Sequence, residues 1–219
     1  MKLRKINCYL LKTRAYFGSV NLTPRPLFAI IHSTMLYTGK GDNGTTKLFG
    51  CDQRMSKSSA IAEALGSVDE INSLLGVVKL QAKDIEAVEG KNYHDLLSDV
   101  QQDLFVIQAE LAGADKHMDS ERVKKVEDWI AAIEKELPPI TSFFVSGGTS
   151  AGAICDYART IARRAERRVV AALEIPDPKE IKEEKPPIFA YLNRLSSLLY
   201  SLARLANHRA GISEEKPHY

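Results

Sequence analysis

The chain has 219 residues and a formal net charge of +2, with 44% hydrophobic and 26% charged residues. Its length supports one substantial core or two small ones, and its near-neutral charge gives no general argument for binding nucleic acid or a membrane surface. No apolar run is long enough to cross a bilayer. The three cysteines are widely spaced, without a CxxC or Cys/His cluster, so neither a zinc site nor a disulfide framework is indicated.

Residues 1–34 differ from the rest of the chain because they contain six lysines and arginines but no Asp or Glu. This composition resembles an organellar transit peptide. The alternatives are a disordered basic tail, or an upstream start codon with Met35 as the true start. We therefore separate this extension from a domain over 35–211 and a tail over 212–219. We expect a cytoplasmic protein, or an organelle-matrix protein if the extension is a transit peptide.

The next segment, Tyr37 to Gly50, reads YTGKGDNGTTKLFG and predicts a compact polar loop. Glycines let backbone N–H groups approach phosphate oxygens, and hydroxyl and lysine side chains supply further donors. Arg54 and Lys57 follow and add positive charge. The loop is neither a Walker A motif nor a dinucleotide-binding fingerprint. A plain Gly/Asn turn is the alternative reading.

From residue 58 onward the pattern is helical. Apolar residues repeat at i, i+3, i+4 and i+7 from Ile61 to Val78, and again from Leu96 to Leu111. A third stretch begins near Ser120, which we expect to be the N-cap, and Pro138 ends it.

Two more helices are expected in the second half of the chain. One ends before Pro176, and the other runs from about Pro187 to Asn207. No strand-like alternation competes with these patterns. Five helices of this length with short connections predict an all-α antiparallel bundle.

The fourth helix follows a Gly-Gly turn in FFVSGGTSAGAICDYARTIARRAERR, residues 143–168. At about 100° per residue, one face of it collects polar side chains: Asp156, Arg159, Arg163, Glu166 and Arg167. Arg164 and Arg168 are expected to point to water. Two arginines one turn apart suit a polyanion such as a triphosphate, and the alternative is a solvated face with i,i+4 pairs. Cys155 is expected to be a core residue and not a nucleophile.

Four motifs occur in one order: TGKGDNGTTKL, ALGSVDEINSLLG, FVSGG followed by ARTIARRAER, and YLNRLSSLL. Together they resemble the PduO-type ATP:cob(I)alamin adenosyltransferases. The resemblance implies a five-helix bundle with an N-terminal glycine-rich ATP loop. It also implies a homotrimer with active sites between adjacent subunits.

The resemblance implies roles for individual residues. ATP would be bound by the loop and by the arginine helix of the neighbouring subunit, through Thr38, Gly39, Lys40, Gly41, Asp42, Gly44, Thr45, Thr46, Lys57, Arg159, Arg163, Glu166, Arg167 and Asn193. Cobalamin would contact Phe143, Asp69 and Ser197. The catalytic set would be Arg159, Arg163, Glu166 and Asp69, with Asp69 paired to Arg159 across the subunit boundary.

The implied reaction is attack of cob(I)alamin on C5′ of ATP, giving adenosylcobalamin and triphosphate. Mg²⁺ would accompany ATP near Glu166, with K⁺ as a further candidate ion. Phe143 would press on the lower face of the corrin ring. A flavin-type reductase and a downstream B12-dependent enzyme are the expected partners, with no role for nucleic acid or membrane.

Several residues have simpler readings. Phe143 could be a core aromatic beside Phe144, Asp69 and Glu70 could be surface charges, and Asn193 could cap the fifth helix. Glu166 could form simple intrahelical pairs with its arginine neighbours.

The chain also departs from the family pattern. Asp156 stands where His is usual and could engage Arg159, Ser197 stands where Asp is usual, and Leu65 stands where an aromatic often precedes Gly66. These departures leave a carrier that binds ATP and a corrinoid with little turnover as one alternative function. A bundle whose basic helix face binds nucleic acid is the other, and the near-neutral charge argues against it.

Overall fold

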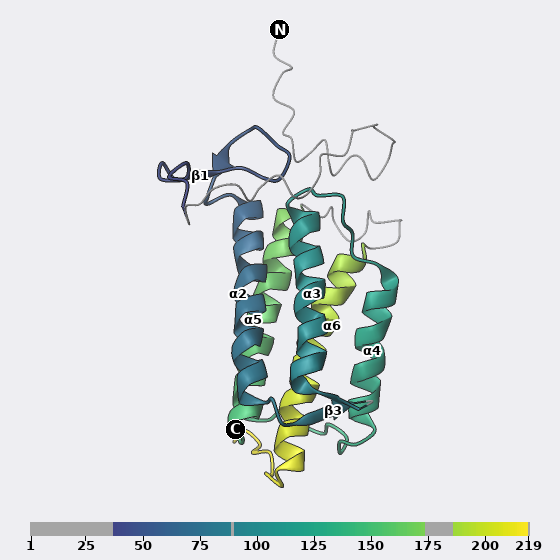
Figure 1. The fold of residues 1–219 in the computed structure, drawn as a ribbon. Helices are drawn as coiled ribbons and strands as arrows, with labels where there is room; N and C mark the ends of the chain where they lie inside the picture. Colours follow the sequence, from purple (N-terminus) through teal and green to yellow (C-terminus); the bar gives the residue numbers. More distant parts are fainter. Residues whose placement is uncertain (1–36, 89, 174–185, 219) are drawn as a thin grey trace.

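The computed structural model describes residues 37–88, 90–173 and 186–218. Its helices are α2 (Ala60–Gln81), α3 (Tyr93–Leu111), α4 (Ser120–Glu134), α5 (Ser150–Ala172) and α6 (Pro187–Arg209). They lie side by side and successive helices run in alternate directions (Figure 1). Helix α5 packs between α2 and α6, and α6 also packs on α4. The predicted all-α five-helix bundle is confirmed.

The helix boundaries follow from capping side chains. Asn92 caps α3 by accepting a hydrogen bond from the Asp95 N–H at 2.8 Å. The expectation that Ser120 caps α4 is wrong. Asp119 is the cap, because its carboxylate accepts from the Arg122 N–H at 2.8 Å, and Ser120 is the first helical residue. Helix α6 begins with Pro187, whose missing N–H costs nothing in the first turn.

Two short hairpins precede and follow α2. Strand β1 (Thr45–Thr46) pairs antiparallel with β2 (Met55–Ser56), and β3 (Glu86–Val88) pairs with β4 (Lys91–Asn92). The sequence pattern predicts no strands, so these two strand pairs were not expected. Segments of two or three residues are too short to show a period-two pattern.

The core contains a buried polar link between three helices. Asp103 on α3 is 4% exposed, and it accepts a hydrogen bond from the Tyr191 hydroxyl of α6 at 2.9 Å. Arg122 of α4 forms an ion pair with the same carboxylate. Burial, together with the negative charge of Asp103, raises the pKa of Tyr191 well above its usual value, so the hydroxyl remains a donor. These bonds fix α3, α4 and α6 relative to one another.

A second polar link fixes the connection between α4 and α5. The Asn207 side chain of α6 accepts from the Thr149 N–H at 2.8 Å and donates to the Gly147 carbonyl at 3.0 Å. Gly148 has a φ of 89°, and a Cβ there would lie 2.6 Å from Asn207 Oδ1. The Gly-Gly turn is therefore needed both for its backbone conformation and for close approach to Asn207.

The C-terminal segment holds the same connection from outside. The Val145 N–H donates to the Glu215 carbonyl at 2.8 Å. Buried Arg204 on α6 donates to the Pro138 carbonyl at 3.0 Å and to Glu214 at 2.9 Å. The guanidinium carbon of Arg204 also lies 5.2 Å from the centre of the Phe144 ring. Residues 138–149 are thus anchored at several points to α6 and to the C-terminal segment.

Substitution of Gly152 tests the Asn207 link. A Cβ at Gly152 would lie 2.4 Å from Asn207 Oδ1. We expect Gly152→Ala to lower the free energy of unfolding by about 1–3 kcal/mol, as overpacking does, in chemical denaturation. Gly76→Ala in α2 is the control, because nothing lies within 4 Å of its Cβ position. The control should gain about 0.5–1 kcal/mol from helix propensity. Equal stabilisation of both variants would contradict the packing argument.

Candidate functional site

A groove of about 520 Å³ opens between residues 140–144, α5 and α6. Its lining among the described residues has two arginines, one carboxylate, three aromatic rings and three serines, and six of these residues matter for the argument: Arg159, Arg163, Asp156, Phe143, Tyr200 and Ser197. Four of these residues were predicted to bind ATP or cobalamin. The structure therefore brings Phe143, Arg159, Arg163 and Ser197 together in one groove.

The two arginines of the groove differ in their partners. Arg159 donates from Nε to Asp156 Oδ1 at 2.6 Å, and its guanidinium carbon lies 5.9 Å from the centre of the Tyr200 ring. The expected engagement of Arg159 by Asp156 is thus observed. Arg163 makes no ion pair with any residue in the described part of the chain. Its charge is available to an anion in the groove.

Phe143 lies on the connection between α4 and α5 and is 80% exposed. The alternative reading of Phe143 as an ordinary core aromatic is therefore wrong for this chain. A phenyl ring at the edge of a groove offers an apolar surface to a flat ligand. Ser197, on α6, is also exposed to the groove.

Glu166 and Asn193 join α5 to α6 one turn beyond Arg163. The Asn193 amide donates to Glu166 Oε1 at 3.0 Å. Asn193 lies inside α6, so the alternative that it caps this helix is wrong. Arg167 is exposed on the same stretch of α5. The Glu166 carboxylate keeps its second oxygen for a further contact.

Arg164 and Arg168 lie away from the groove and are partly exposed to water, as expected, but each also has a partner on α2. Arg164 forms an ion pair with Glu70, and Arg168 Nε lies 3.4 Å from Glu63 Oε1. Both contacts join α5 to α2. The helix therefore divides its arginines between a face that lines the groove and a face that binds a neighbouring helix.

The glycine-rich loop forms a tight turn before α2. Its N–H groups bond inside the loop, with Asp42 N donating to the Gly39 carbonyl at 3.2 Å and Gly44 N to the Gly41 carbonyl at 3.1 Å. A Cβ at Gly41 would lie 3.0 Å from the Lys57 ammonium. Lys57 therefore lies directly over the loop, as predicted, and Gly41 leaves room for it.

The remaining predicted loop residues define the rest of the turn. Thr38 Oγ1 accepts from the Lys40 N–H at 3.4 Å, and Thr45 and Thr46 form β1. The Thr45 hydroxyl donates to Asn43 at 2.6 Å. The loop thus exposes glycine backbone, hydroxyls and two lysines on one short segment.

Arg54 is a loop-positioning residue that was not predicted as part of the site. It donates to Thr45 Oγ1 at 2.6 Å and to the Thr45 carbonyl at 2.8 Å, and it also bonds the Lys40 carbonyl. The only signal in the sequence was a basic residue close to the loop. Its pairing with Thr45 depends on the β1–β2 hairpin, which the sequence did not reveal.

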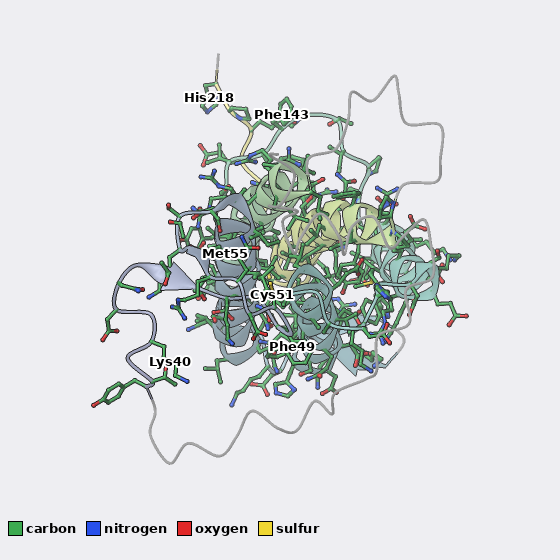
Figure 2. All side chains as sticks on the ribbon, turned by 90° about the horizontal axis from the view of Figure 1, so that it is seen from above. Lys40, Phe49, Cys51, Met55, Phe143 and His218 are labelled. Atoms are coloured by element: carbon green, nitrogen blue, oxygen red, sulfur yellow. The ribbon has the colours of Figure 1, made fainter. Side chains whose placement is uncertain are left out.

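The loop and the groove lie apart within one chain. Figure 2 shows Lys40 beyond one side of the bundle and Phe143 beyond another. Asp69 does not reach Arg159 in this chain, because its carboxylate accepts from Gln108 at 3.3 Å on the α2–α3 side. No described residue of the loop lines the groove, so the predicted ATP-binding residues do not share one cavity on one subunit.

The described residues offer little support for a cysteine nucleophile, a metal cluster or a membrane-spanning helix. Burial raises the pKa of Cys155 to about 12, with a further contribution from the Asp156 charge, so the thiol stays protonated at neutral pH. The described ranges hold no cluster of three or more His, Cys, Asp or Glu side chains suited to a metal ion. Within them, no helix has the length and apolar character needed to cross a membrane.

Fold and site define a class: a helical bundle with a glycine-rich, basic loop at one place and an arginine-lined groove at another. The sequence model of the cobalamin adenosyltransferases matches residues 36–206. The chain belongs to this family.

Two relatives illustrate the similarity. The corrinoid adenosyltransferase PduO of Salmonella typhimurium is 35% identical over 190 residues, covering 82% of this chain and 53% of that protein. The corrinoid adenosyltransferase of Bacillus subtilis is 36% identical over 186 residues, covering 82% of this chain and 90% of that protein. The chain thus spans about half the length of the Salmonella protein.

Solved structures of a PduO-type adenosyltransferase from Lactobacillus reuteri are also similar. An arginine-to-lysine variant complexed with ATP has a TM-score of 0.69 at 27% identity, with 84% of this chain and 100% of that chain covered. A phenylalanine-to-histidine variant complexed with cobalamin and ATP has a TM-score of 0.71 at 27% identity, with 84% and 97% covered.

Proposed function

We propose that the protein transfers the 5′-deoxyadenosyl group of ATP to the cobalt of cob(I)alamin, releasing triphosphate. The observation that carries this proposal is the groove, where Phe143, Arg159 and Arg163 meet. The family membership and the ligands named for the Lactobacillus reuteri structures support it.

The chemistry of the groove suits this reaction. The electron pair of cobalt(I) attacks C5′, the bond from C5′ to the triphosphate oxygen breaks, and its electrons leave with the triphosphate. No proton has to move, so no general base is required. The protein has to align C5′ with cobalt and stabilise a highly charged leaving group. Arg163, with no ion pair among the described residues, is suited to the second task.

The glycine loop would hold the triphosphate. Lys57 lies over Gly41, and the hydroxyls of Thr38, Thr45 and Thr46 lie along the same turn. Because the loop and the groove are separate in one chain, we infer that a complete site combines the loop of one subunit with the groove of another. A homotrimer with Asp69 facing the neighbour's Arg159 is the assembly that we propose.

Glu166 fits a role with Mg²⁺. A single carboxylate beside a triphosphate suits this ion, which keeps several waters and takes few protein ligands. When bound with ATP, Mg²⁺ would neutralise charge on the phosphate oxygens. Asn193 would hold Glu166 in place through their hydrogen bond. A K⁺ ion, the reductase, the downstream B12-dependent enzyme and the cytoplasmic location stay predictions of the sequence.

The carrier reading is a second candidate, and one observation favours it. Asp156 neutralises Arg159 inside the groove, which reduces the positive charge available to ATP. Such a protein would bind both ligands and turn over slowly.

An anaerobic visible-spectrum assay separates the two functions. Purified protein is mixed with ATP, Mg²⁺ and chemically reduced cob(I)alamin, and the cob(I)alamin band is followed with triphosphate release. We expect stoichiometric loss of the band over many turnovers. Tight binding of both ligands without turnover would support the carrier instead.

Arg163→Ala tests the leaving-group role. We expect it to lower kcat/KM about 100-fold or more, as loss of a charge-stabilising donor does, with an unchanged circular dichroism spectrum. Arg168→Ala is the matched control, because Arg168 lies on the same helix but pairs with Glu63. The role is refuted if the two variants lose activity equally.

Phe143→Ala tests the contact with the corrin ring. An apolar side chain beneath the ring would exclude the lower axial ligand and make cobalt(II) easier to reduce. We expect turnover coupled to reduction of cob(II)alamin to fall about tenfold more than turnover with pre-reduced cob(I)alamin. Phe105→Ala, an exposed aromatic on α3, is the control. Equal losses with both cobalt states would argue against the wedge.

A further inference from the structure

We propose that Asp156 is a positioning residue, which holds the Arg159 guanidinium so that its two terminal nitrogens face the anionic substrate. This inference rests on the proposed function and adds one residue to it. Among the described residues that line the groove, Asp156 is the only carboxylate.

The hydrogen bond between Asp156 and Arg159 uses the Nε–H edge of the guanidinium. Asp156 Oδ1 accepts from Arg159 Nε at 2.6 Å, which is a short charge-assisted hydrogen bond. The two terminal nitrogens of Arg159 have no recorded acceptor in the described part of the chain. Within one subunit they therefore remain free to bind anionic oxygens in a fork, from a phosphate of ATP and from the neighbour's Asp69 in the proposed trimer.

Two further features restrict the position of this guanidinium. The Asp156 side chain is 12% exposed and the Arg159 side chain 28%, so the pair lies in the wall of the groove. The guanidinium carbon also lies 5.9 Å from the centre of the Tyr200 ring on α6. Held by a carboxylate from one side and an aromatic ring from the other, Arg159 loses less conformational freedom when it binds a ligand.

The charges in the groove give Arg159 and Arg163 different roles. Among the described residues, Asp156, Arg159 and Arg163 are the charged residues that line it, so two positive charges face one negative charge there. Asp156 balances Arg159 and leaves Arg163 as the uncompensated charge. Arg159 accordingly orients the phosphate through a fixed guanidinium, and Arg163 stabilises the negative charge of the leaving group.

The two departures from the family pattern meet in this groove. Asp156 stands where His is usual, Ser197 stands where Asp is usual, and both line the same space. Within the described part of the chain, the one carboxylate that lines the groove therefore comes from α5, beside Arg159, and not from α6.

A double-mutant cycle tests the positioning role. The variants are Asp156→Asn, Arg159→Lys and the double variant, with kcat and KM for ATP measured with pre-reduced cob(I)alamin. We expect Asp156→Asn to lower kcat about tenfold, while KM for ATP stays equal or falls because the groove gains positive charge. Lysine has neither Nε–H nor a fork, so adding Asp156→Asn to Arg159→Lys should change kcat less than about twofold. Glu63→Gln, which removes an ion-pair carboxylate outside the groove, is the control.

Additive losses in the cycle, or a rise in KM with unchanged kcat, would overturn the inference. A second measurement does not need turnover. In ¹⁵N–¹H spectra, the Nε–H signal of Arg159, assigned by its loss in Arg159→Lys, should exchange slowly with water in the wild type and rapidly in Asp156→Asn. Fast exchange in the wild type would overturn the positioning role even if the protein were active. A wild type that shows slow exchange but no turnover would refute the proposed function alone.

Discussion

The groove depends on the Asn207 side chain at the end of α6. Its amide bonds Gly147 of the Gly-Gly turn on one side and Thr149, the N-cap of α5, on the other, which leaves no room for a Cβ at Gly148 or Gly152. This contact sets where α5 begins and where the preceding connection ends. Phe143 lies on that connection and the arginines lie on that helix, so this interaction joins the apolar wall of the groove to the charged wall, together with the contacts of Arg204 and Val145.

The bundle distributes its charges by helix face. Arg164 and Arg168 bind carboxylates of α2, while Arg159 and Arg163 line the groove. Exposed ion pairs of this kind contribute little to stability, typically below about 1 kcal/mol each. They join α5 to α2 on the side away from the groove, whereas the other two arginines line the groove with residues 140–144 and α6.

Much of this arrangement could be predicted from the sequence. Apolar periodicity placed all five helices, because each buries one continuous stripe, and the angular positions of Arg159 and Arg163 put them on one face. Contacts between segments that are distant in the sequence could not be predicted from this periodicity. The periodicity could not show that Arg164 and Arg168 pair with carboxylates of α2. It also could not show that Arg54 donates hydrogen bonds to Thr45, or that Asp119 and not Ser120 caps α4. Each of these depends on atoms from a second segment, or on one side-chain rotamer.

We infer that a working site combines the loop of one subunit with the groove of another. Complementation tests it most directly: Lys57→Ala and Arg163→Ala chains are co-expressed with different tags, and mixed oligomers are purified. Each variant alone should be nearly inactive. Every purified mixed trimer has two subunits of one variant and one of the other, so one of its three sites, about a third, combines an intact loop with an intact groove. Recovery of adenosyl transfer to that level is the predicted result. Mixed oligomers no more active than the separate variants would show that both groups act within one chain, and would contradict the account.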